Sequence, residues 1–294
     1  MPVVNVGVVG VGLLGSAVAG RLLAGGFKVA GYDPAPAGVE ALAAKGLRKA
    51  GSAADAARGA DAVFTILPTL EAVETVVMGA GGLLETAPGA VVIQMSTIST
   101  DLARRLAEAA AEKGVPFLDT PISGTSAMVA RGDCTILVAG DEGVAESCQP
   151  LFSALGNLTI HLGAPGNATL AKLCTNLLVA LNTASLAEAF VLGAKGGLDH
   201  AKILEVIGKT AGGSRMADIR GPSMVSGDYS AQMKMELFLK DLRLMAEEAE
   251  RGGLTLPMLD TARELYGQAS GDGRALQDLA SVCGHLEKMA GIER

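Results

Sequence analysis

The sequence predicts an α/β protein: a doubly wound, mostly parallel sheet, followed by an all-helical domain and joined to it by one long interdomain helix. Up to residue 163, short apolar runs rich in β-branched residues alternate with helical patterns, which is typical of a parallel sheet covered on both faces. Beyond that point only helical periodicity remains. We therefore expect a sheet domain at residues 1–163 and a helical domain at residues 164–294.

The individual elements follow from the same patterns. In the first domain we expect strands at residues 3–9, 28–32, 62–67, 91–95, 116–119, 135–139 and 158–162. The expected helices between them are 14–24, 36–45, 70–77, 100–113 and 142–155. The long helix is expected at 167–195, followed by helices at 199–209, 234–251, 257–266 and 276–289. Open sheets of this type bind ligands beyond the carboxyl ends of their strands, so motifs at those ends are the candidates for function.

Composition excludes several classes of protein. The 294 residues carry 24 Lys and Arg against 31 Asp and Glu, a net charge of −7, so no basic surface for nucleic acid is expected. Aromatic residues make up 3% of the chain and Trp is absent, which argues against a base-stacking platform. Hydrophobic residues make up 49% and charged residues 19%, which indicates a folded chain with a large core.

Cysteine spacing and apolar segments indicate a cytoplasmic protein without metal. The four cysteines are far apart and form no CxxC pair, and no histidine lies near one at zinc spacing, so we expect buried free thiols. Residues 1–20 are uncharged but lack the basic start of a signal peptide. Residues 173–194 are apolar but contain scattered polar groups, which favours a helix buried in protein over one that faces lipid.

A glycine motif follows the first strand. The stretch from Gly10 to Gly15, GVGLLG, is a GxGxxG that opens a helix, the context in which this motif binds a pyrophosphate. Asp33 ends the second strand at the distance where a carboxylate accepts from the ribose hydroxyls of NAD and repels the 2′-phosphate of NADP. No Arg occupies the next two positions. NAD is therefore favoured over NADP, although Asp33-Pro34 is also compatible with a simple turn.

The ends of three further strands carry candidate binding residues, and the polar ones allow a second, purely structural interpretation. The segment from Leu67 to Pro68 ends one strand, and Ser96 and Thr97 end the next, where either hydroxyl could instead cap the following helix. The stretch Ser123-Gly124-Thr125 offers a hydroxyl and a bare backbone N–H to a carboxylate, but without further information it is also a turn.

Two lysines on predicted helices are further candidates. Lys172 and Asn176 are four residues apart on the long helix and so share one face. The ammonium of Lys172 could donate a proton to a carbonyl oxygen, or it could simply extend to solvent at the start of the helix. Lys240 and Asp241 are adjacent, so we expect them to point about 100° apart and to need separate partners, with a surface pair as the default.

Taken in order, these motifs resemble those of the β-hydroxyacid dehydrogenases, the group that includes 3-hydroxyisobutyrate dehydrogenase and tartronate semialdehyde reductase. The four stretches are GVGLLGSAVAGRLLAGGF from Gly10, FLDTPISG from Phe117, GNATLAKLCTN from Gly166 and LKDL from Leu239. The resemblance covers essentially the whole chain. It implies a Rossmann-type sheet domain and a helical domain for substrate binding and oligomerisation.

The resemblance also implies roles for single residues. The adenosine diphosphate end of the cofactor would be held by Gly10, Gly12, Leu13, Leu14, Gly15 and Asp33. The nicotinamide side would be lined by Leu67, Pro68 and Thr97, with Lys240 close by. The substrate carboxylate would be bound by Ser123, Gly124 and Asn176, with Thr125 also at the substrate. The catalytic residues would be Lys172, as the general acid/base, and Asn176, as its helper. The family usually continues SGG where this chain has Ser123-Gly124-Thr125, which puts the substrate, rather than the chemistry, in doubt.

The implied function is hydride transfer between NAD and a small β-hydroxy acid or the matching semialdehyde. An imine reductase is the rival enzyme, although such proteins generally carry Asp or Tyr where Lys172 stands. A non-catalytic NAD-binding protein is the rival from another class. A 6-phosphogluconate dehydrogenase is disfavoured because the helical part is too short. Because the long helix is apolar around most of its circumference, we expect a homodimer or homotetramer.

Overall fold

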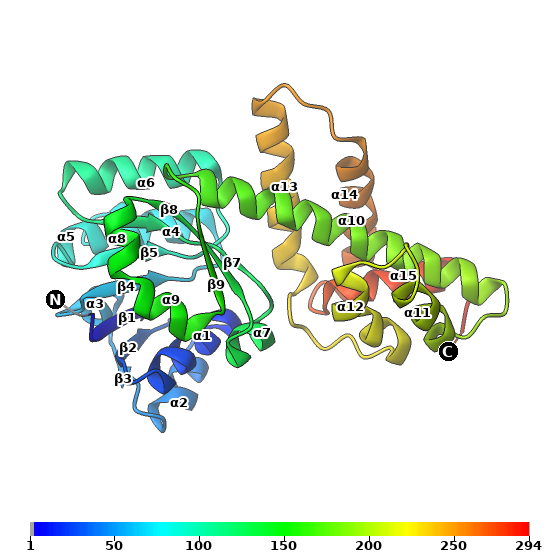
Figure 1. Ribbon diagram of the computed structural model, residues 1–294, viewed down its shortest axis with the longest axis horizontal. Coiled ribbons are helices and arrows are strands. Elements are labelled where there is room, and N and C mark those ends of the chain that lie inside the picture. The colour runs from blue at the N-terminus through cyan, green and yellow to red at the C-terminus, as the bar shows by residue number, and fades with distance from the viewer. Residues whose placement is uncertain (1–2, 294) are drawn as a thin grey trace. The chain divides into compact units, whose positions relative to one another are not determined.

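The computed structural model describes residues 3–293 and confirms the predicted fold class (Figure 1). The chain divides into two compact units, Met1–Lys172 and Leu173–Arg294. The division falls inside the long helix α10 (Asn167–Lys195), which was expected with the same bounds. The predicted domain boundary at residue 163 lies at the turn before this helix.

The first unit is built on one mixed sheet that is parallel through most of its width. Its strands follow the order β3-β2-β1-β4-β5-β6-β8-β7, with β9 beside β8. Pairing is parallel from β3 to β6, whereas β8 runs antiparallel to both β6 and β7. The strands are β1 (Asn5–Val9), β2 (Lys28–Tyr32), β3 (Arg48–Lys49), β4 (Ala62–Thr65), β5 (Val91–Gln94), β6 (Phe117–Asp119), β7 (Ile122–Ser123), β8 (Thr135–Gly140) and β9 (Leu158–His161).

Helices cover both faces of this sheet. Val63 and Phe64 are neighbours on β4, and because side chains alternate along a strand they enter different cores. Phe64 packs with α1 and α9, whereas Val63 packs with α3 to α6. The helices are α1 (Leu13–Ala24), α2 (Ala37–Ala43), α3 (Ala53–Ala57), α4 (Leu70–Met78), α5 (Leu83–Thr86), α6 (Thr100–Glu112), α7 (Ser126–Arg131), α8 (Glu142–Ser147) and α9 (Gln149–Leu155).

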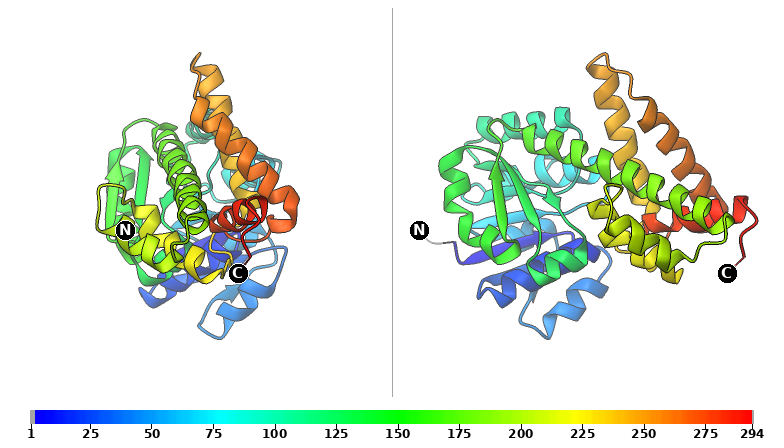
Figure 2. Two further views of the ribbon diagram at one scale, coloured as in Figure 1. Left: turned by 90° about the vertical axis from the view of Figure 1, so that its right-hand side faces the viewer. Right: turned by 45° about the vertical axis from the view of Figure 1, so that its right-hand side comes forward.

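The second unit is helical throughout (Figure 2). Phe238 and Tyr266 meet edge to face, with their ring centres 6.0 Å apart, and the Tyr266 hydroxyl donates to the carbonyl of Ala180 on α10. Arg220 and Asp278 form a buried ion pair at 3.1 Å. The helices that follow α10 are α11 (His200–Gly208), α12 (Arg215–Ser226), α13 (Met235–Arg251), α14 (Pro257–Ala269) and α15 (Val282–Met289), with a kink at Ser270–Arg274 and a 3-10 turn at Leu279–Ser281.

Several predicted elements differ from those observed, for local reasons. The helix expected at 142–155 is broken at Cys148 into α8 and α9, and Pro150, which has no N–H to donate, stands at the start of α9. The helix expected at 276–289 begins only at Val282, because the Asp278 carboxylate accepts from the Ala280 backbone and starts a 3-10 turn. The elements that sequence periodicity missed are all short except α12: β3, β7, α3, α5, α7 and α12.

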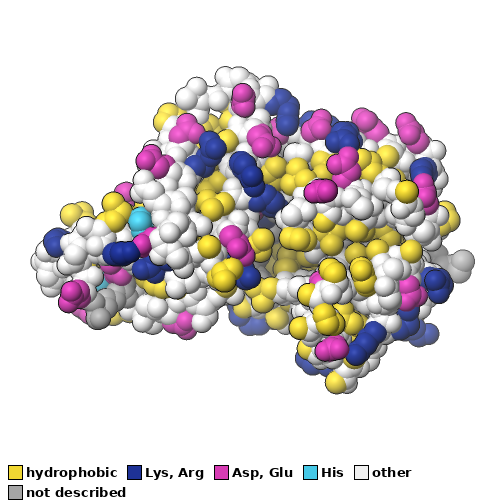
Figure 3. Space-filling view, turned by 180° about the vertical axis from the view of Figure 1, so that it is seen from behind, with side chains coloured by type: hydrophobic (Ala, Val, Ile, Leu, Met, Phe, Trp, Pro, Cys, Tyr) yellow, Lys and Arg dark blue, Asp and Glu magenta, His cyan; other side chains and the backbone are white. Residues whose placement is uncertain are grey.

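The thiols and the long helix differ in part from expectation. Cys134, Cys148 and Cys283 are buried free thiols as predicted, but Cys174 is exposed. Burial raises the pKa of Cys134 to about 11. Helix α10 is long and apolar enough to cross a membrane by length and composition alone, yet only 33% of its most apolar window is buried in the described chain. On the face seen in Figure 3, Lys and Arg side chains are interspersed with Asp and Glu.

Candidate active site

The glycine motif forms a tight turn that only glycine can adopt at two of its three positions. Gly10 has φ of +94°, and a Cβ there would lie 2.1 Å from the carbonyl oxygen of Ile66. A Cβ on Gly15 would lie 1.9 Å from the carbonyl oxygen of Gly10. By contrast, a Cβ on Gly12 would have no atom within 4 Å. Gly10 and Gly15 therefore shape the turn, whereas Gly12 keeps the approach to the N-terminus of α1 open.

Asp33 is tied to the same turn by its carboxylate. Oδ2 accepts from the backbone N–H of Val11 at 2.7 Å, and Oδ1 accepts from the N–H of Ala35 at 2.8 Å. The interpretation of Asp33-Pro34 as a turn is therefore confirmed, and the carboxylate also lies beside the glycine motif. Each oxygen has a second lone pair with which to accept a further donor.

The ends of β4 and β5 adjoin this turn. The backbone N–H of Leu67 donates to the hydroxyl of Ser96 at 2.8 Å. The Leu67 side chain lies 3.3 Å from the place that a Gly10 Cβ would take. The helix cap expected at Ser96 or Thr97 is instead Ser99, whose hydroxyl accepts from the N–H of Leu102. The interpretation of Ser96 as a cap was therefore wrong.

The first unit thus brings together most of the predicted cofactor residues at the carboxyl edge of the sheet. Those gathered around the β1–α1 turn and the ends of β2, β4 and β5 are Gly10, Gly12, Leu13, Leu14, Gly15, Asp33, Leu67, Pro68 and Thr97. Because these strands are neighbours and parallel, their carboxyl ends form one continuous edge.

The predicted turn around Ser123 is a short strand followed by a helix. Ser123 pairs with Thr135 on β8. Gly124 has φ of +154°, and a Cβ there would lie 3.0 Å from the Cβ of Cys134. The hydroxyl of Thr125 accepts from the N–H of Met128 and caps α7. The threonine that departs from the family pattern is therefore engaged as a helix cap.

A buried carboxylate that the sequence interpretation did not single out fixes the start of α10. Asp119 ends β6 with none of its surface exposed. Its oxygens accept from the N–H of Gly166 at 3.2 Å, and from the N–H and hydroxyl of Thr169 at 2.9 and 2.7 Å. Burial raises the pKa of Asp119, against the opposing effect of these hydrogen bonds. Lys172 follows Thr169 by one helical turn and is itself buried, with 8% exposed.

In the second unit, Asp241 holds two of the predicted residues. The Asn176 amide donates through Nδ2 to Asp241 Oδ2 at 2.9 Å, and Lys240 Nζ lies 3.4 Å from Asp241 Oδ1. The expectation that Lys240 and Asp241 would need separate partners on the surface was wrong, because the long lysine side chain reaches back to its neighbour. Asp241 is 3% exposed. The apolar residues around this aspartate, Phe238 and Leu242, were the signal that it lies inside.

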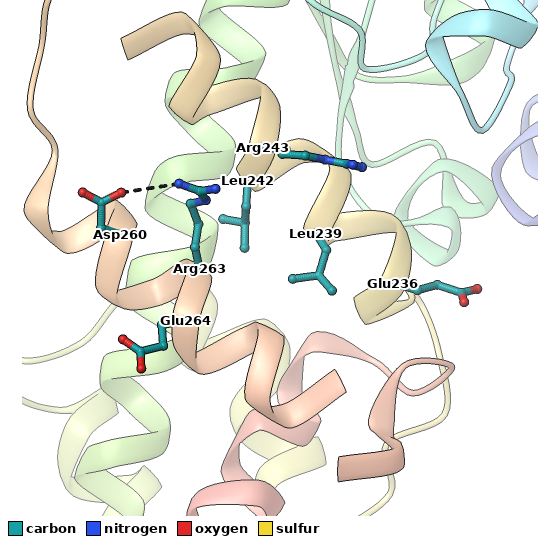
Figure 4. A pocket seen from close by; sticks show the side chains of 7 residues that line it. All are labelled: Glu236, Leu239, Leu242, Arg243, Asp260, Arg263 and Glu264. Carbon is teal, nitrogen blue, oxygen red and sulfur yellow. Dashed lines mark ion pairs between the residues drawn. The ribbon is translucent and has the colours of Figure 1, made fainter. Parts of the chain in front are cut away.

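A separate groove lies between α13 and α14 and contains none of the predicted site residues (Figure 4). Its volume is about 690 Å³. Arg263 pairs with Asp260 across one side at 3.5 Å. The full lining is Glu236, Leu239, Leu242, Arg243, Asp260, Arg263 and Glu264. Because charges of both signs line an open groove, it lacks the features of an enclosed substrate pocket.

Fold and site together define a dinucleotide-binding protein with a helical second domain. One family profile, described as the NAD binding domain of 6-phosphogluconate dehydrogenase, matches residues 5–163. Another, described as NAD-binding of NADP-dependent 3-hydroxyisobutyrate dehydrogenase, matches residues 166–286. The chain is 37% identical to 2-(hydroxymethyl)glutarate dehydrogenase of Eubacterium barkeri over 90% of this chain and 88% of that protein. It is 36% identical to NAD-dependent L-serine dehydrogenase of Pseudomonas aeruginosa over 85% of this chain and 87% of that protein.

A solved structure of a hydroxy-acid dehydrogenase has the same fold as this chain. A 3-hydroxyisobutyrate dehydrogenase from Salmonella typhimurium is 29% identical, with a TM-score of 0.88 over 96% of this chain and 99% of that one. The chain belongs to the β-hydroxyacid dehydrogenase family and is an NAD(P)-dependent oxidoreductase. An imine reductase from Myxococcus stipitatus has a TM-score of 0.66 at 20% identity, a likeness of fold alone. The findings thus support the hydroxyacid dehydrogenase over the imine reductase.

The two glycines of the turn are expected to respond differently to the same substitution. Gly12→Ala should leave the thermal unfolding midpoint close to that of the wild type, because its Cβ has room, and should weaken NAD binding by about tenfold or more. Gly15→Ala should lower the midpoint, because the new Cβ overlaps a carbonyl oxygen. Thermal unfolding and calorimetric titration with NAD measure both effects. Wild-type NAD affinity in Gly12→Ala would contradict the assignment of this turn.

Proposed function

We propose that this protein is a cytoplasmic enzyme that transfers hydride between NAD and a small β-hydroxy acid or the matching semialdehyde, with Lys172 as the general acid/base. The observation that carries the proposal is the burial of Lys172, one turn after the Asp119 anchor and within the segment that resembles the family's catalytic motif. A lysine that is 8% exposed bears a desolvation cost that a lysine extending to solvent avoids.

The chain's own residues would perform binding and proton transfer. When bound, the nicotinamide supplies or accepts the hydride. The open N-terminus of α1 at Gly12 would receive the pyrophosphate, and Asp33 would accept from the ribose hydroxyls. In the reductive direction Lys172 Nζ would donate a proton to the carbonyl oxygen, and in the oxidative direction it would take the hydroxyl proton.

Asn176 would bind the substrate carboxylate from an orientation fixed by Asp241. A carboxylate accepts only, so it must face the NH₂ side of the Asn176 amide. That amide has two N–H groups, and one donates to Asp241. The second would donate to the substrate, together with the hydroxyl of Ser123 and the backbone N–H of Gly124. Lys240, paired with the other oxygen of Asp241, would lie near the nicotinamide.

Removal of the Lys172 amine should abolish most turnover without disturbing the cofactor site. We expect Lys172→Ala to lower kcat by about two orders of magnitude or more, the usual loss when a general acid/base is removed, with little change in NAD affinity. The substrate for this measurement comes from an NAD-linked screen of 3-hydroxy acids and semialdehydes.

Lys195→Ala, at the exposed end of the same helix, is the matched control and should retain wild-type turnover. More than about a tenth of wild-type kcat in Lys172→Ala would remove this lysine from the mechanism. Absence of turnover with the whole panel would favour a non-catalytic NAD-binding protein.

Asp33 should select NAD over NADP. Its carboxylate would lie where NADP places its 2′-phosphate, so we expect kcat/KM for NAD to exceed that for NADP by about tenfold or more, or about 1.4 kcal/mol. Asp33→Asn retains an oxygen that can accept from the N–H of Val11 but removes the charge. This variant should bring the ratio of kcat/KM for NAD to kcat/KM for NADP closer to one. Equal efficiency of the wild-type enzyme with both cofactors would refute the role of Asp33.

The helical unit should pair with a second copy of this chain. Leu178 and Leu192 on α10 are 58% and 78% exposed, which is costly for large apolar side chains on one helix. We propose that they lie in the interface of a homodimer or homotetramer. Light scattering at micromolar concentration should give at least a dimer, and Leu178→Glu should shift it towards monomer. Leu158→Glu, at an exposed leucine of β9, is the control and should leave assembly unchanged. A monomeric wild type would contradict the proposal.

A further inference from the structure

The second unit brings together three metal-ligating side chains that sequence spacing does not connect. His200 begins α11, and Cys283 and Glu287 lie four residues apart on α15. Their ligand atoms all lie within 4.8 Å of one another. Cys283 is fully buried, Glu287 is 5% exposed and His200 is half-buried. The cluster lies within the helical unit and shares no residue with the proposed active site.

The surrounding helices hold these three side chains in place. Residues four apart on a helix share a face, so Cys283 and Glu287 both point toward His200. The His200 ring stacks on Phe190 of α10 at 5.3 Å, with 15° between the planes, which restricts its rotation. Lys195, at the end of α10, donates to the carbonyl of Ala290 just after α15, and so ties the two helix ends together.

The imidazole and the carboxylate already form a hydrogen bond. His200 Nε2 lies 2.8 Å from Glu287 Oε1. An ion pair would account for these two residues alone. It does not require a third, softer ligand atom, yet the Cys283 sulfur converges on the same point. The convergence of nitrogen, sulfur and oxygen ligands is the arrangement that Zn²⁺ and its neighbours in the first transition row prefer.

We propose that His200, Cys283 and Glu287 form a binding site for a divalent transition-metal ion of the Zn²⁺ class. Tetrahedral zinc sets its ligand atoms about 3.4 Å apart. The His200–Glu287 pair must therefore open slightly, and no pair in the cluster must close by more than about 1.4 Å, within reach of side-chain rotation. A thiolate and a carboxylate balance the charge of the ion. Three protein ligands leave a fourth position for water, and the His200 side chain retains 14% of its surface exposed.

The ion would fasten α15, and with it the C-terminal end of the described chain, to the start of α11. Ligands from two helices become one unit when they share an ion, so metal binding is coupled to the stability of the fold. The expected consequence is a higher unfolding midpoint with Zn²⁺ than without it.

The test uses the full chain, stripped with EDTA and titrated with Zn²⁺ alone against a chromophoric chelator. We expect one tightly bound ion per chain, with affinity reduced by about tenfold or more in Cys283→Ser and in Glu287→Gln. Cys174→Ser and His161→Gln remove an exposed cysteine and an exposed histidine outside the cluster, and should bind as the wild type does. Circular dichroism establishes that each variant is folded.

Co²⁺ provides a second readout that does not depend on any variant folding. Bound to the wild-type chain, it should show the near-ultraviolet charge-transfer absorption of a thiolate–cobalt bond, and Cys283→Ser should lack it. A wild-type chain without this band would overturn the proposal. Equal Zn²⁺ affinity in the wild type and in Glu287→Gln would also overturn it. Loss of Zn²⁺ binding in the control variants, with binding retained in the cluster variants, would overturn it as well.

Discussion

The buried carboxylate of Asp119 is the constraint on which the proposed chemistry depends. A sheet and a helix that leaves it could take many relative angles, but three hydrogen bonds fix the first turn of α10 to the end of β6. The orphan N–H groups at a helix start need acceptors, and Asp119 supplies them where water has no access. Lys172, one turn further along, is thereby held relative to the same sheet edge that carries the glycine turn.

A second carboxylate connects the features of the cofactor end. Asp33 accepts from Val11 within the glycine turn, so the residue that would bind ribose also stabilises the turn that would bind pyrophosphate. The ends of β1 and β2 are thus linked at one edge of the sheet by a short polar contact rather than by a large side-chain cluster. This arrangement explains why small residues and backbone groups predominate there.

The sequence predicted the longer strands and helices well because the spacing of apolar residues reflects which faces of an element are buried. All strands of the sheet except β3 and β7, the glycine turn with Asp33 and the bounds of α10 followed from apolar spacing and glycine placement. Short elements such as β7 and α7 were missed because they are too short to show a period. Asp119 and Asp241 were not assigned roles because their partners, Thr169 and Asn176, are distant in sequence. Likewise, His200 and Cys283 meet only through tertiary packing.

The shared carboxylate of Asp241 has a consequence for how this family can change over time. Asn176 and Lys240 each contact one of its oxygens, so the effects of substitutions at these two positions should be energetically coupled. Loss of either partner leaves a buried charge less well compensated, so loss of the second partner should cost more than loss of the first. Substitutions at these two positions should therefore be tolerated singly more readily than in pairs, unless Asp241 itself is replaced by a neutral residue, which removes the charge that both partners stabilise.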